Sequence, residues 1–393
     1  MSTIKFGMIG VGGRGEIFYE SNHLPEEGFE IVAGADLSDK ALEKFQKKIP
    51  GAKCFHDYRE LLALEEIDAV FIITPDFLHE EMAVAALNSG KDVYLEKPLA
   101  ITVDGCSNIL RAAMNNKRKL YLGHNMRFMP VIQEMKRMID EGMIGEVQCA
   151  WERHFINYGG DAYFHDWHSE QRRSTGLLLQ KGAHDIDILH WLMGSYTTKV
   201  AAMGMLSVYD KCERRPVEDK EPYNVTENWL KLRYPADAAK DYSAVIDVED
   251  HNMILMQLAN GKQVSYMHCH YSPDSDRNFC FIGTKGKIEN HGVGKDAQIL
   301  YWNKRQGNTL LPDQVFTIRG LDGTHGGADP LIMKNFREYI RGNEKPLTNP
   351  VDAMRAVLVG ITAHEAMRNG TLAGNIPEIA PDIVEYFNQE SAK

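Results

Sequence analysis

The chain has 393 residues, of which 44% are apolar and 25% are charged, a composition ordinary for a globular protein of two or three domains. The 44 Lys and Arg residues against 55 Asp and Glu give a formal net charge of −11, which disfavours nucleic acid and anionic membranes as partners. The six cysteines form no Cys-x-x-Cys pair, and neither a signal-like N-terminus nor a membrane-spanning apolar run occurs. We therefore expect a cytoplasmic protein with reduced thiols and no membrane span.

The first 125 residues alternate between short apolar runs and helical patterns. The runs are apolar throughout, as strands are when both faces of their sheet are covered. Between them, apolar residues recur at helical spacing, first over 41–49 and then over 82–87. This alternation predicts an α/β domain over residues 1–125 with a doubly wound parallel sheet. The predicted strands lie at residues 5–9, 30–36, 68–74, 92–95 and 119–122.

From residue 126 onward the pattern changes to long alternating strands. Asn260-Gly261 lies between two alternating apolar segments and predicts a hairpin, and Thr284-Lys285-Gly286 predicts another turn between strands. Consecutive hairpins indicate an antiparallel sheet, so residues 126–393 are predicted to form an α+β domain. The predicted elements are helices at 130–141 and 350–370, strands at 148–155, 199–209, 228–234 and 253–271, and an exposed loop at 211–224.

The segment Gly10-Val11-Gly12-Gly13-Arg14-Gly15 has the pattern G-x-G-x-x-G between a predicted strand and a predicted helix. Glycine allows a tight turn and a close approach to a pyrophosphate, and the helix N-terminus offers free N–H donors. Asp36 ends the second predicted strand, 21 residues after Gly15, where a carboxylate can bind ribose hydroxyls. The sequence therefore predicts a dinucleotide site. Asp36 favours NAD over NADP because it repels a 2′-phosphate, although Lys40 nearby keeps NADP open.

Two further segments carry residues suited to acid–base chemistry. Glu96-Lys97-Pro98 follows a predicted strand at the edge where ligands bind in open α/β sheets. A lysine there can stabilise an alkoxide, but lysine more often lies on a solvent-exposed loop. Gln180, His184 and Asp187 are spaced to share one helix face. His184 could be a general base oriented by Asp187, or a hydrogen-bonded core histidine.

The stretch 151–173 is rich in aromatic rings, histidine and arginine, which suits a sugar pocket but also fits a polar surface. No zinc-like spacing occurs in it, so no metal is predicted. His268-Cys269-His270 alternates along a predicted strand and is interpreted as sheet surface. The pair Arg172-Arg173 could bind an acidic substituent or be surface charge. The residues of interest in the stretch are Trp151, His154, Tyr158, Tyr163, His165, Trp167, His168, Arg172 and Arg173.

Together these motifs resemble the Gfo/Idh/MocA oxidoreductase family, the relatives of glucose–fructose oxidoreductase and inositol dehydrogenase. The resemblance covers nearly the whole chain. It implies that the Rossmann domain is followed by a large, mostly antiparallel sheet that supports a homodimer or homotetramer, with the helices of 350–393 packing back on the first domain. The motifs that carry it are Gly10–Gly15, Thr74-Pro75 with His79, Glu96-Lys97-Pro98, Asn125-Met126-Arg127-Phe128, Gly182-x-His184-x-x-Asp187 and Gly326-Gly327-Ala328-Asp329.

The resemblance implies an NAD-dependent oxidoreductase that oxidises a secondary hydroxyl of a sugar, sugar derivative or cyclitol. Lys97 and His184 are then the catalytic residues beside the nicotinamide. The expected cofactor-binding residues are Gly10, Gly12, Gly13, Arg14, Gly15, Asp36, Thr74, Pro75, His79, Glu96, Lys97, Asn125 and Trp167. The expected substrate-binding residues are Arg127, Gln180, Lys181, His154, Tyr158, Tyr163, His165 and Arg172.

One departure from the family pattern keeps alternatives open. Many dehydrogenases of the family carry Asp four residues before the catalytic histidine, where this chain has Gln180. An amide cannot ionise, so it cannot raise the basicity of His184. The first alternative is a redox-neutral glycosidase that oxidises a ring carbon, eliminates the aglycone, adds water and reduces the ketone again. A non-catalytic NAD(P)-sensing protein and a reductase of an imine or enone are further alternatives on the same fold.

Overall fold

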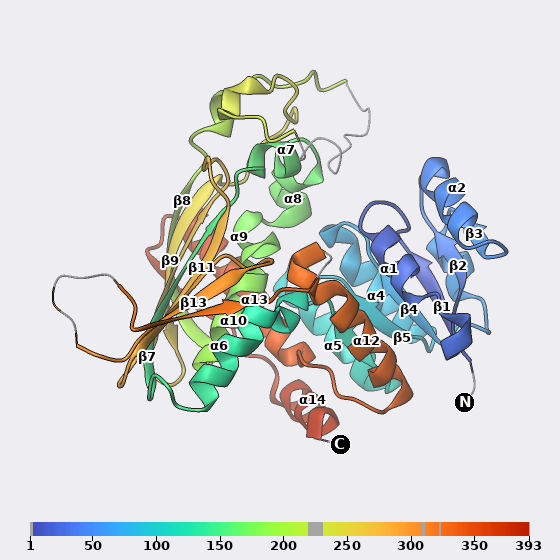
Figure 1. Cartoon of the computed structure of the whole chain (residues 1–393). Coiled ribbons are helices and arrows are strands. Elements are labelled where there is room, and N and C mark those ends of the chain that lie inside the picture. The colour runs from blue at the N-terminus through green and yellow to red at the C-terminus, as the bar shows by residue number, and fades with distance from the viewer. Residues whose placement is uncertain (1–2, 219–230, 306, 308–310, 322–323, 393) are drawn as a thin grey trace. The chain divides into compact units, whose positions relative to one another are not determined.

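The computed structural model describes residues 3–218, 231–305, 307, 311–321 and 324–392. The chain divides into two compact units, each shown in Figure 1. The first comprises residues 1–124, 330–354 and 378–393, and the second comprises 125–329 and 355–377. Within the described ranges, no helix is both long enough and apolar enough to cross a membrane.

The first unit is built on a six-stranded parallel sheet with the order β3-β2-β1-β4-β5-β6. This order confirms the predicted doubly wound fold, and the order reverses between β1 and β4, where such sheets bind ligands. The edge strand β3 was not predicted, because it is three residues long and none of its side chains is fully buried. The strands are β1 (Ile4–Ile9), β2 (Phe29–Ala35), β3 (Lys53–Phe55), β4 (Ala69–Ile72), β5 (Asp92–Leu95) and β6 (Leu120–Leu122).

Aromatic side chains hold a helix on this sheet. The ring of Phe336 lies 5.0, 5.2 and 5.3 Å from the rings of Phe71, Tyr94 and Tyr121, mostly edge to face. These rings supply much buried apolar area, so they anchor helix α12 on β4, β5 and β6. The helices of this unit are α1 (Gly15–Asn22), α2 (Asp39–Lys48), α3 (Tyr58–Leu62), α4 (His79–Asn88), α5 (Val103–Asn116), α12 (Ala328–Arg341, from Pro330 on) and α14 (Pro381–Ala392).

The second unit contains a nine-stranded sheet with the order β14-β13-β12-β11-β7-β10-β9-β8-β15. Among the strands described in this sheet, only β7 and β10 pair in parallel, which confirms a large, mostly antiparallel sheet. The predicted hairpin joins β9 to β10, and Gly261 supplies the positive φ of +82° that its turn requires. The strands are β7 (Val147–Phe155), β8 (Thr197–Met205), β9 (His251–Leu258), β10 (Gln263–Cys269), β11 (Asp276–Gly283), β12 (Lys287–His291), β13 (Ala297–Trp302), β14 (Gln314–Ile318) and β15 (Ala373–Asn375).

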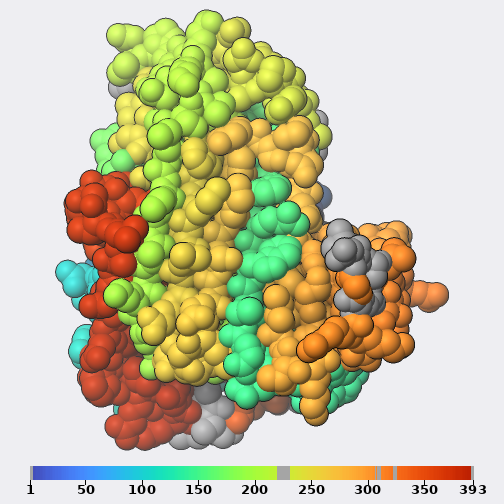
Figure 2. All heavy atoms as spheres, turned by 90° about the vertical axis from the view of Figure 1, so that its left-hand side faces the viewer, coloured from blue at the N-terminus to red at the C-terminus, as the bar shows by residue number. Residues whose placement is uncertain are grey.

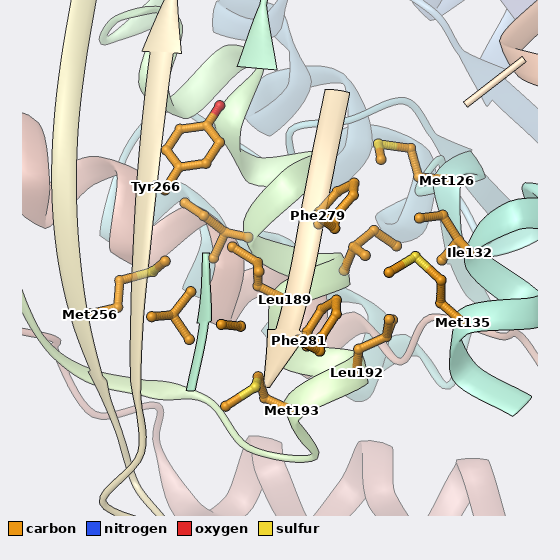
Figure 3. Packing of buried hydrophobic residues seen from close by; sticks show 14 of the residues in the cluster. Met126, Ile132, Met135, Leu189, Leu192, Met193, Met256, Tyr266, Phe279 and Phe281 are labelled. Atoms are coloured by element: carbon orange, nitrogen blue, oxygen red, sulfur yellow. The ribbon is translucent and has the colours of Figure 1, made fainter. Parts of the chain in front are cut away.

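Helices cover one face of this sheet, and the core lies between them and the strands (Figures 1 and 3). Met135 and Leu189 from the helices pack with Phe279 and Phe281 of β11, and all four are fully buried. The hydroxyl of Tyr266 points away from this apolar cluster in Figure 3. The helices are α6 (Pro130–Asp140), α7 (Gly159–Tyr163), α8 (Gln171–Ser174), α9 (Leu177–Gln180), α10 (Gly182–Met193) and α13 (Pro350–Arg368, from Arg355 on).

No helix among the described residues covers the opposite face of the sheet (Figure 2). Along β9 the side chains alternate, so that Ile254 and Met256 are buried while Met253 and Leu255 are 53% and 64% exposed. Two hollows of about 490 and 770 Å³ lie on this face, lined in part by Leu255 and Trp151. We call this surface the open sheet face. Its exposed apolar side chains include Met203, Met253, Leu255 and Leu372.

Two sequence expectations for this unit need comment. The interpretation of His268 and His270 as sheet surface was wrong, because both side chains are fully buried. Alternation showed that they share a face of the predicted strand, but it could not show that this is the face under the helices. The predicted strand 228–234 lies partly outside the described residues, and its described part, 231–234, is not a strand. The loop 211–224 is described only to residue 218; there most side chains are at least partly exposed, except Cys212.

Candidate active site

The glycine-rich loop of the first unit connects β1 to α1. Gly10 has φ +87°, and a Cβ there would lie 2.4 Å from the carbonyl oxygen of Ile73. A Cβ on Gly15 would lie 2.3 Å from the carbonyl oxygen of Gly10. Neither position tolerates a side chain, whereas nothing lies within 4 Å of a Cβ built on Gly13. The loop therefore folds tightly on its inner side and presents bare backbone on the other, as a pyrophosphate site requires.

Asp36 follows β2 and is tied to this loop. Its Oδ2 accepts hydrogen bonds from the backbone N–H groups of Val11 and Gly12 at 3.0 and 3.2 Å, and Oδ1 accepts from Ser38 at 2.9 Å. A carboxylate has about four acceptor positions, so Asp36 keeps capacity for ribose hydroxyls. A pocket of about 830 Å³ lies here, lined by Gly10, Gly12 and Asp36 among others. These residues fit the adenosine and phosphates of a dinucleotide.

The charges that line this pocket are mostly negative. Asp36, Asp57, Glu60 and Glu81 contribute carboxylates. Arg59 is the one Lys or Arg among the described lining residues, and its guanidinium is ion-paired with Asp57 and Glu81 at 3.3 and 2.6 Å. These carboxylates would repel a 2′-phosphate, and the arginine of this lining is already paired with two of them.

Glu96 joins the glycine-rich loop to Lys97. Its side chain is buried, and Oε1 accepts a charge-assisted hydrogen bond of 2.9 Å from Nε of Arg14. Its Oε2 accepts from the backbone N–H of Lys97 at 3.0 Å. One carboxylate thus fixes the backbone at Lys97, directly after the carboxyl end of β5, relative to the loop that would hold the phosphates.

His79 holds two loops of the same edge together. Its ring is fully buried, with Nδ1 2.7 Å from the carbonyl oxygen of Pro98 and Nε2 3.0 Å from that of Thr74. Burial lowers the pKa of His79, despite both carbonyls, which favour the charged ring. His79 therefore stabilises the shape of the site, because its ring connects the backbone at Thr74 to the backbone at Pro98.

In the second unit, His184 lies in the first turn of α10 and is 7% exposed. Gln180 ends the preceding helix α9 and is 5% exposed. Asp187 is ion-paired with Arg127, whose Nε and Nη2 donate to its two carboxylate oxygens at 2.8 and 2.6 Å. Both side chains are buried, so Arg127 and Asp187 neutralise each other.

A second buried ion pair joins Asp185, two residues before Asp187 on α10, to Arg277 and was not predicted. Asp185 accepts hydrogen bonds from Nδ1 of His154 at 2.8 Å and from the hydroxyl of Tyr266 at 2.9 Å. Nε of Arg277 lies 2.8 Å from its other oxygen, as an ion pair not aligned for a hydrogen bond. Burial opposes ionisation, but Arg277 and then His154 outweigh it and lower the pKa of Asp185 to about 2. Burial and then the charge of Asp185 raise the pKa of Glu152 well above its ordinary value.

Three histidine rings lie in a row beside this ion pair, the first two stacked and the last two edge to face. The ring of His154 lies 5.2 Å from that of His268, which lies 4.2 Å from that of His270. Burial lowers the pKa of all three, to about 4 for His154. The row continues to Tyr163, 5.5 Å from His270, and Nζ of Lys181 lies 4.8 Å above the Tyr163 ring. Within the described ranges, no three His, Cys, Asp or Glu side chains are grouped to hold a metal ion.

The other predicted site residues of this unit lie in varied surroundings. His165 is buried with both ring nitrogens engaged, at 2.7 Å from the carbonyl oxygen of Gly160 and 3.1 Å from the carboxylate of Asp241. Arg172 has a side chain that is 74% exposed and ion-paired with Glu170. His165 is thus placed as a core residue and Arg172 as a surface residue.

Three further predicted residues occupy defined positions. Asn125 donates from Nδ2 to Asp329 at 2.8 Å, which connects two of the motifs noted in the sequence. Trp167 stacks on the ring of His168 with 3.7 Å between the ring centres. The ring of Tyr158 lies 6.3 Å from that of Tyr163. The structure therefore brings His154, Tyr158, Tyr163 and Lys181 into one cluster.

Comparison with known proteins places these features in one family. The family profile described as "Oxidoreductase family, NAD-binding Rossmann fold" matches residues 4–124, and "Oxidoreductase family, C-terminal alpha/beta domain" matches residues 136–374. The two units are those of an NAD-binding oxidoreductase. The chain belongs to the Gfo/Idh/MocA oxidoreductase family.

Similar curated proteins include the putative oxidoreductase YteT of Bacillus subtilis, 25% identical over 78% of this chain and 82% of that protein. An inositol 2-dehydrogenase/D-chiro-inositol 3-dehydrogenase of Halalkalibacterium halodurans is 33% identical over 49% of this chain and 53% of its own length. The α-N-acetylgalactosaminidase of Shewanella oneidensis is 24% identical over 98% of this chain and 87% of its own.

Solved structures confirm the fold. A levoglucosan dehydrogenase in complex with NADH and levoglucosan is 18% identical, with a TM-score of 0.77 over 96% of this chain and 100% of that one. A putative NADPH-dependent oxidoreductase from Desulfitobacterium hafniense is 20% identical, with a TM-score of 0.74 over 98% and 99%. At these identities the likeness concerns the fold alone.

Proposed function

We propose that this chain oxidises a secondary hydroxyl of a sugar, sugar derivative or cyclitol, with NAD as hydride acceptor, in the cytoplasm. The observation that carries the proposal is the connection of the glycine-rich loop to Lys97 through Arg14 and Glu96. It fixes a lysine backbone beside a loop suited to the phosphates of a dinucleotide. The inositol dehydrogenase relative supports the substrate class.

In the proposed mechanism the nicotinamide, when bound, supplies the acceptor for the hydride that leaves the substrate carbon. His184 accepts the proton of the hydroxyl, and Lys97 stabilises the oxygen as negative charge develops on it. Gln180 donates or accepts a hydrogen bond but cannot exchange a proton, so it orients the substrate. Arg127, held by Asp187 in the segment before α6, also orients the substrate.

We also propose that NAD is preferred to NADP. The pocket beside Asp36 carries four carboxylates, and its one described arginine is already ion-paired. Adding a phosphate at the 2′ position would place two negative groups together, whereas a ribose hydroxyl can donate to Asp36.

A redox-neutral glycosidase is the second candidate. The α-N-acetylgalactosaminidase relative aligns with 98% of this chain, and Gln180 replaces the family carboxylate. In this reaction the substrate is oxidised at a ring carbon, the adjacent C–H loses its proton and the aglycone leaves. Water then adds and the ketone is reduced, so that no NADH accumulates.

The first measurement is NADH formation with a panel of free sugars, cyclitols and aryl glycosides, with aglycone release read in parallel. We expect stoichiometric NADH from a free sugar or cyclitol, no released aglycone, and a higher kcat/KM with NAD than with NADP. Aglycone release without NADH would establish the glycosidase instead. A protein that binds NADH but changes no compound in the panel would contradict both reactions.

We further propose that the open sheet face joins copies of the chain into a homodimer or homotetramer. Its exposed Met203, Met253, Leu255 and Leu372 form an apolar surface unusual for a monomer.

Leu255→Asp is expected to convert the oligomer to a monomer, because it buries a charge in the interface. The molar mass is measured by light scattering. Val217→Asp is the matched control and should leave the oligomer intact, since Val217 is 73% exposed and lies in the loop after residue 211 and not on a strand of the sheet. A monomeric wild type would refute the interface.

A further inference from the structure

A histidine that no sequence motif indicated lines the pocket beside Asp36. His56 directly follows the edge strand β3, which pairs in parallel with β2, so the carboxyl ends of both strands lie at one edge of the sheet (Figure 1). Asp36 directly follows β2, and both residues line the pocket of about 830 Å³. The side chain of His56 is 60% exposed, so its ring is accessible to a ligand and to protons from the solvent.

Two acceptor groups contact the ring of His56. Nδ1 lies 3.2 Å from the carbonyl oxygen of Asp36, and Nε2 lies 3.2 Å from Oδ1 of Asp39 in the first turn of α2. A carbonyl oxygen only accepts hydrogen bonds, so Nδ1 carries a hydrogen. An ionised carboxylate also only accepts, so a second hydrogen on Nε2 completes the contact with Asp39. The surroundings of the ring are therefore complementary to its positively charged form.

His56 differs from the other charged groups around it, because they are carboxylates and one paired guanidinium. Arg59 is ion-paired with two carboxylates, and Lys40 is exposed on α2 and is not among the described lining residues. Histidine is the side chain that ordinarily changes its charge between pH 5 and 8. His56 is therefore the one residue of the described lining that can gain a positive charge near neutral pH. The charged groups around it are Asp36 after β2, Asp39 on α2, Asp57 before α3, Arg59 and Glu60 on α3 and Glu81 on α4.

We infer that His56 determines how strongly this pocket discriminates against a dinucleotide with a 2′-phosphate. With a neutral ring, the carboxylates of the lining repel the phosphate. A charged ring adds one positive charge to the lining, and its Nε2–H can donate to a phosphate oxygen. Asp39 then loses little, because its side chain is 86% exposed and water can solvate it.

The inference rests on the proposed function and names a specificity determinant of the same cofactor site. It predicts that the preference for NAD over NADP is strong above neutral pH. The preference weakens as the pH falls through the range in which histidine becomes charged. A ribose hydroxyl carries no charge, so binding of NAD itself depends less on His56.

Binding of NADH and NADPH to the full chain tests the inference without any substrate. Both dissociation constants are measured by fluorescence titration at low ionic strength, at about pH 8 and about pH 5.5, for wild type and His56→Gln. Glutamine keeps a donor for the carbonyl oxygen of Asp36 but cannot become charged. As the pH falls, the ratio of the NADPH constant to the NADH constant should decrease about 3- to 10-fold further in wild type than in His56→Gln, the effect of one charge at an exposed site.

The comparison with His56→Gln also corrects for the phosphate, since a phosphate monoester itself takes up a proton near about pH 6. A second variant, His56→Lys, is charged over the whole range and should lower the ratio at about pH 8 by a similar factor. His291→Gln is the matched control and should keep the wild-type response, because His291 is exposed at the end of β12 and does not line the pocket.

Two results would overturn the inference and leave the proposed function intact. One is a change of the ratio with pH that is equal in wild type and His56→Gln. The other is an unchanged ratio at about pH 8 in His56→Lys. Failure of the wild type to bind either NADH or NADPH at both pH values would overturn the proposed function together with the inference.

Discussion

Replacement of Lys97 or of His184 by alanine is expected to lower kcat by about a thousand-fold or more. His184→Ala removes the proposed acceptor of the hydroxyl proton, and Lys97→Ala removes the positive charge that stabilises the alkoxide. Neither change alters the glycine-rich loop or Asp36, so NADH affinity, measured by fluorescence titration, should stay nearly unchanged. The split between kcat and cofactor affinity distinguishes lost chemistry from lost binding.

Two surface substitutions are matched controls for this prediction. Lys47→Ala removes an exposed lysine in the last turn of α2, and His291→Ala removes a histidine whose side chain is 57% exposed at the end of β12. Both should keep wild-type kcat. Turnover that persists in both Lys97→Ala and His184→Ala would refute the mechanism as drawn, and loss of NADH binding in either would assign that residue to the cofactor site.

The sequence predicted the elements that depend on local pattern. Uniformly apolar runs located the strands of the first unit, and Asn260-Gly261 located the hairpin between β9 and β10, because both features are set by neighbouring residues. The position of Asp36 after β2 was predicted for the same reason. The prediction failed where it depended on which face of a strand is buried. Period-two alternation places His268 and His270 on one side of a strand, but only the packing of helices decides which side is buried.

The buried ion pairs could not have been predicted from spacing. Arg127 and Asp187 are 60 residues apart in sequence, and Arg277 is far from both Asp185 and Glu152. These contacts depend on strand order, which places β11 next to β7 under α10. One sequence feature did point to them. Glu152 and His154, like Tyr266 and His268, are two residues apart on predicted strands, so each pair presents polar groups to one face.

Replacement of Arg277 by methionine is expected to destabilise the second unit by about 3–5 kcal/mol at neutral pH. Methionine keeps much of the side-chain volume but leaves Asp185 as a buried carboxylate without its cation. The five tryptophans all lie between residues 151 and 302, so tryptophan fluorescence during urea unfolding reports on this unit alone. A loss below about 1 kcal/mol would mean that water reaches Asp185 and solvates it.

The dependence on pH and two further variants identify the cause of that loss. In the wild type, Arg277 lowers the pKa of Asp185 to about 2, so this pair contributes stability above pH 4, which is lost as the pH falls towards 2. The difference in stability between wild type and Arg277→Met should shrink over the same window, because protonated Asp185 needs no cation.

Adding Asp185→Asn to Arg277→Met should recover most of the stability, since no buried charge remains. Glu152→Gln should cost little, because burial and then the charge of Asp185 raise the pKa of Glu152 well above its ordinary value and so favour the uncharged acid, which an amide can replace. A large loss of stability in Glu152→Gln would instead show that Glu152 is ionised. Two carboxylates, Asp185 and Glu152, would then share the charge of Arg277.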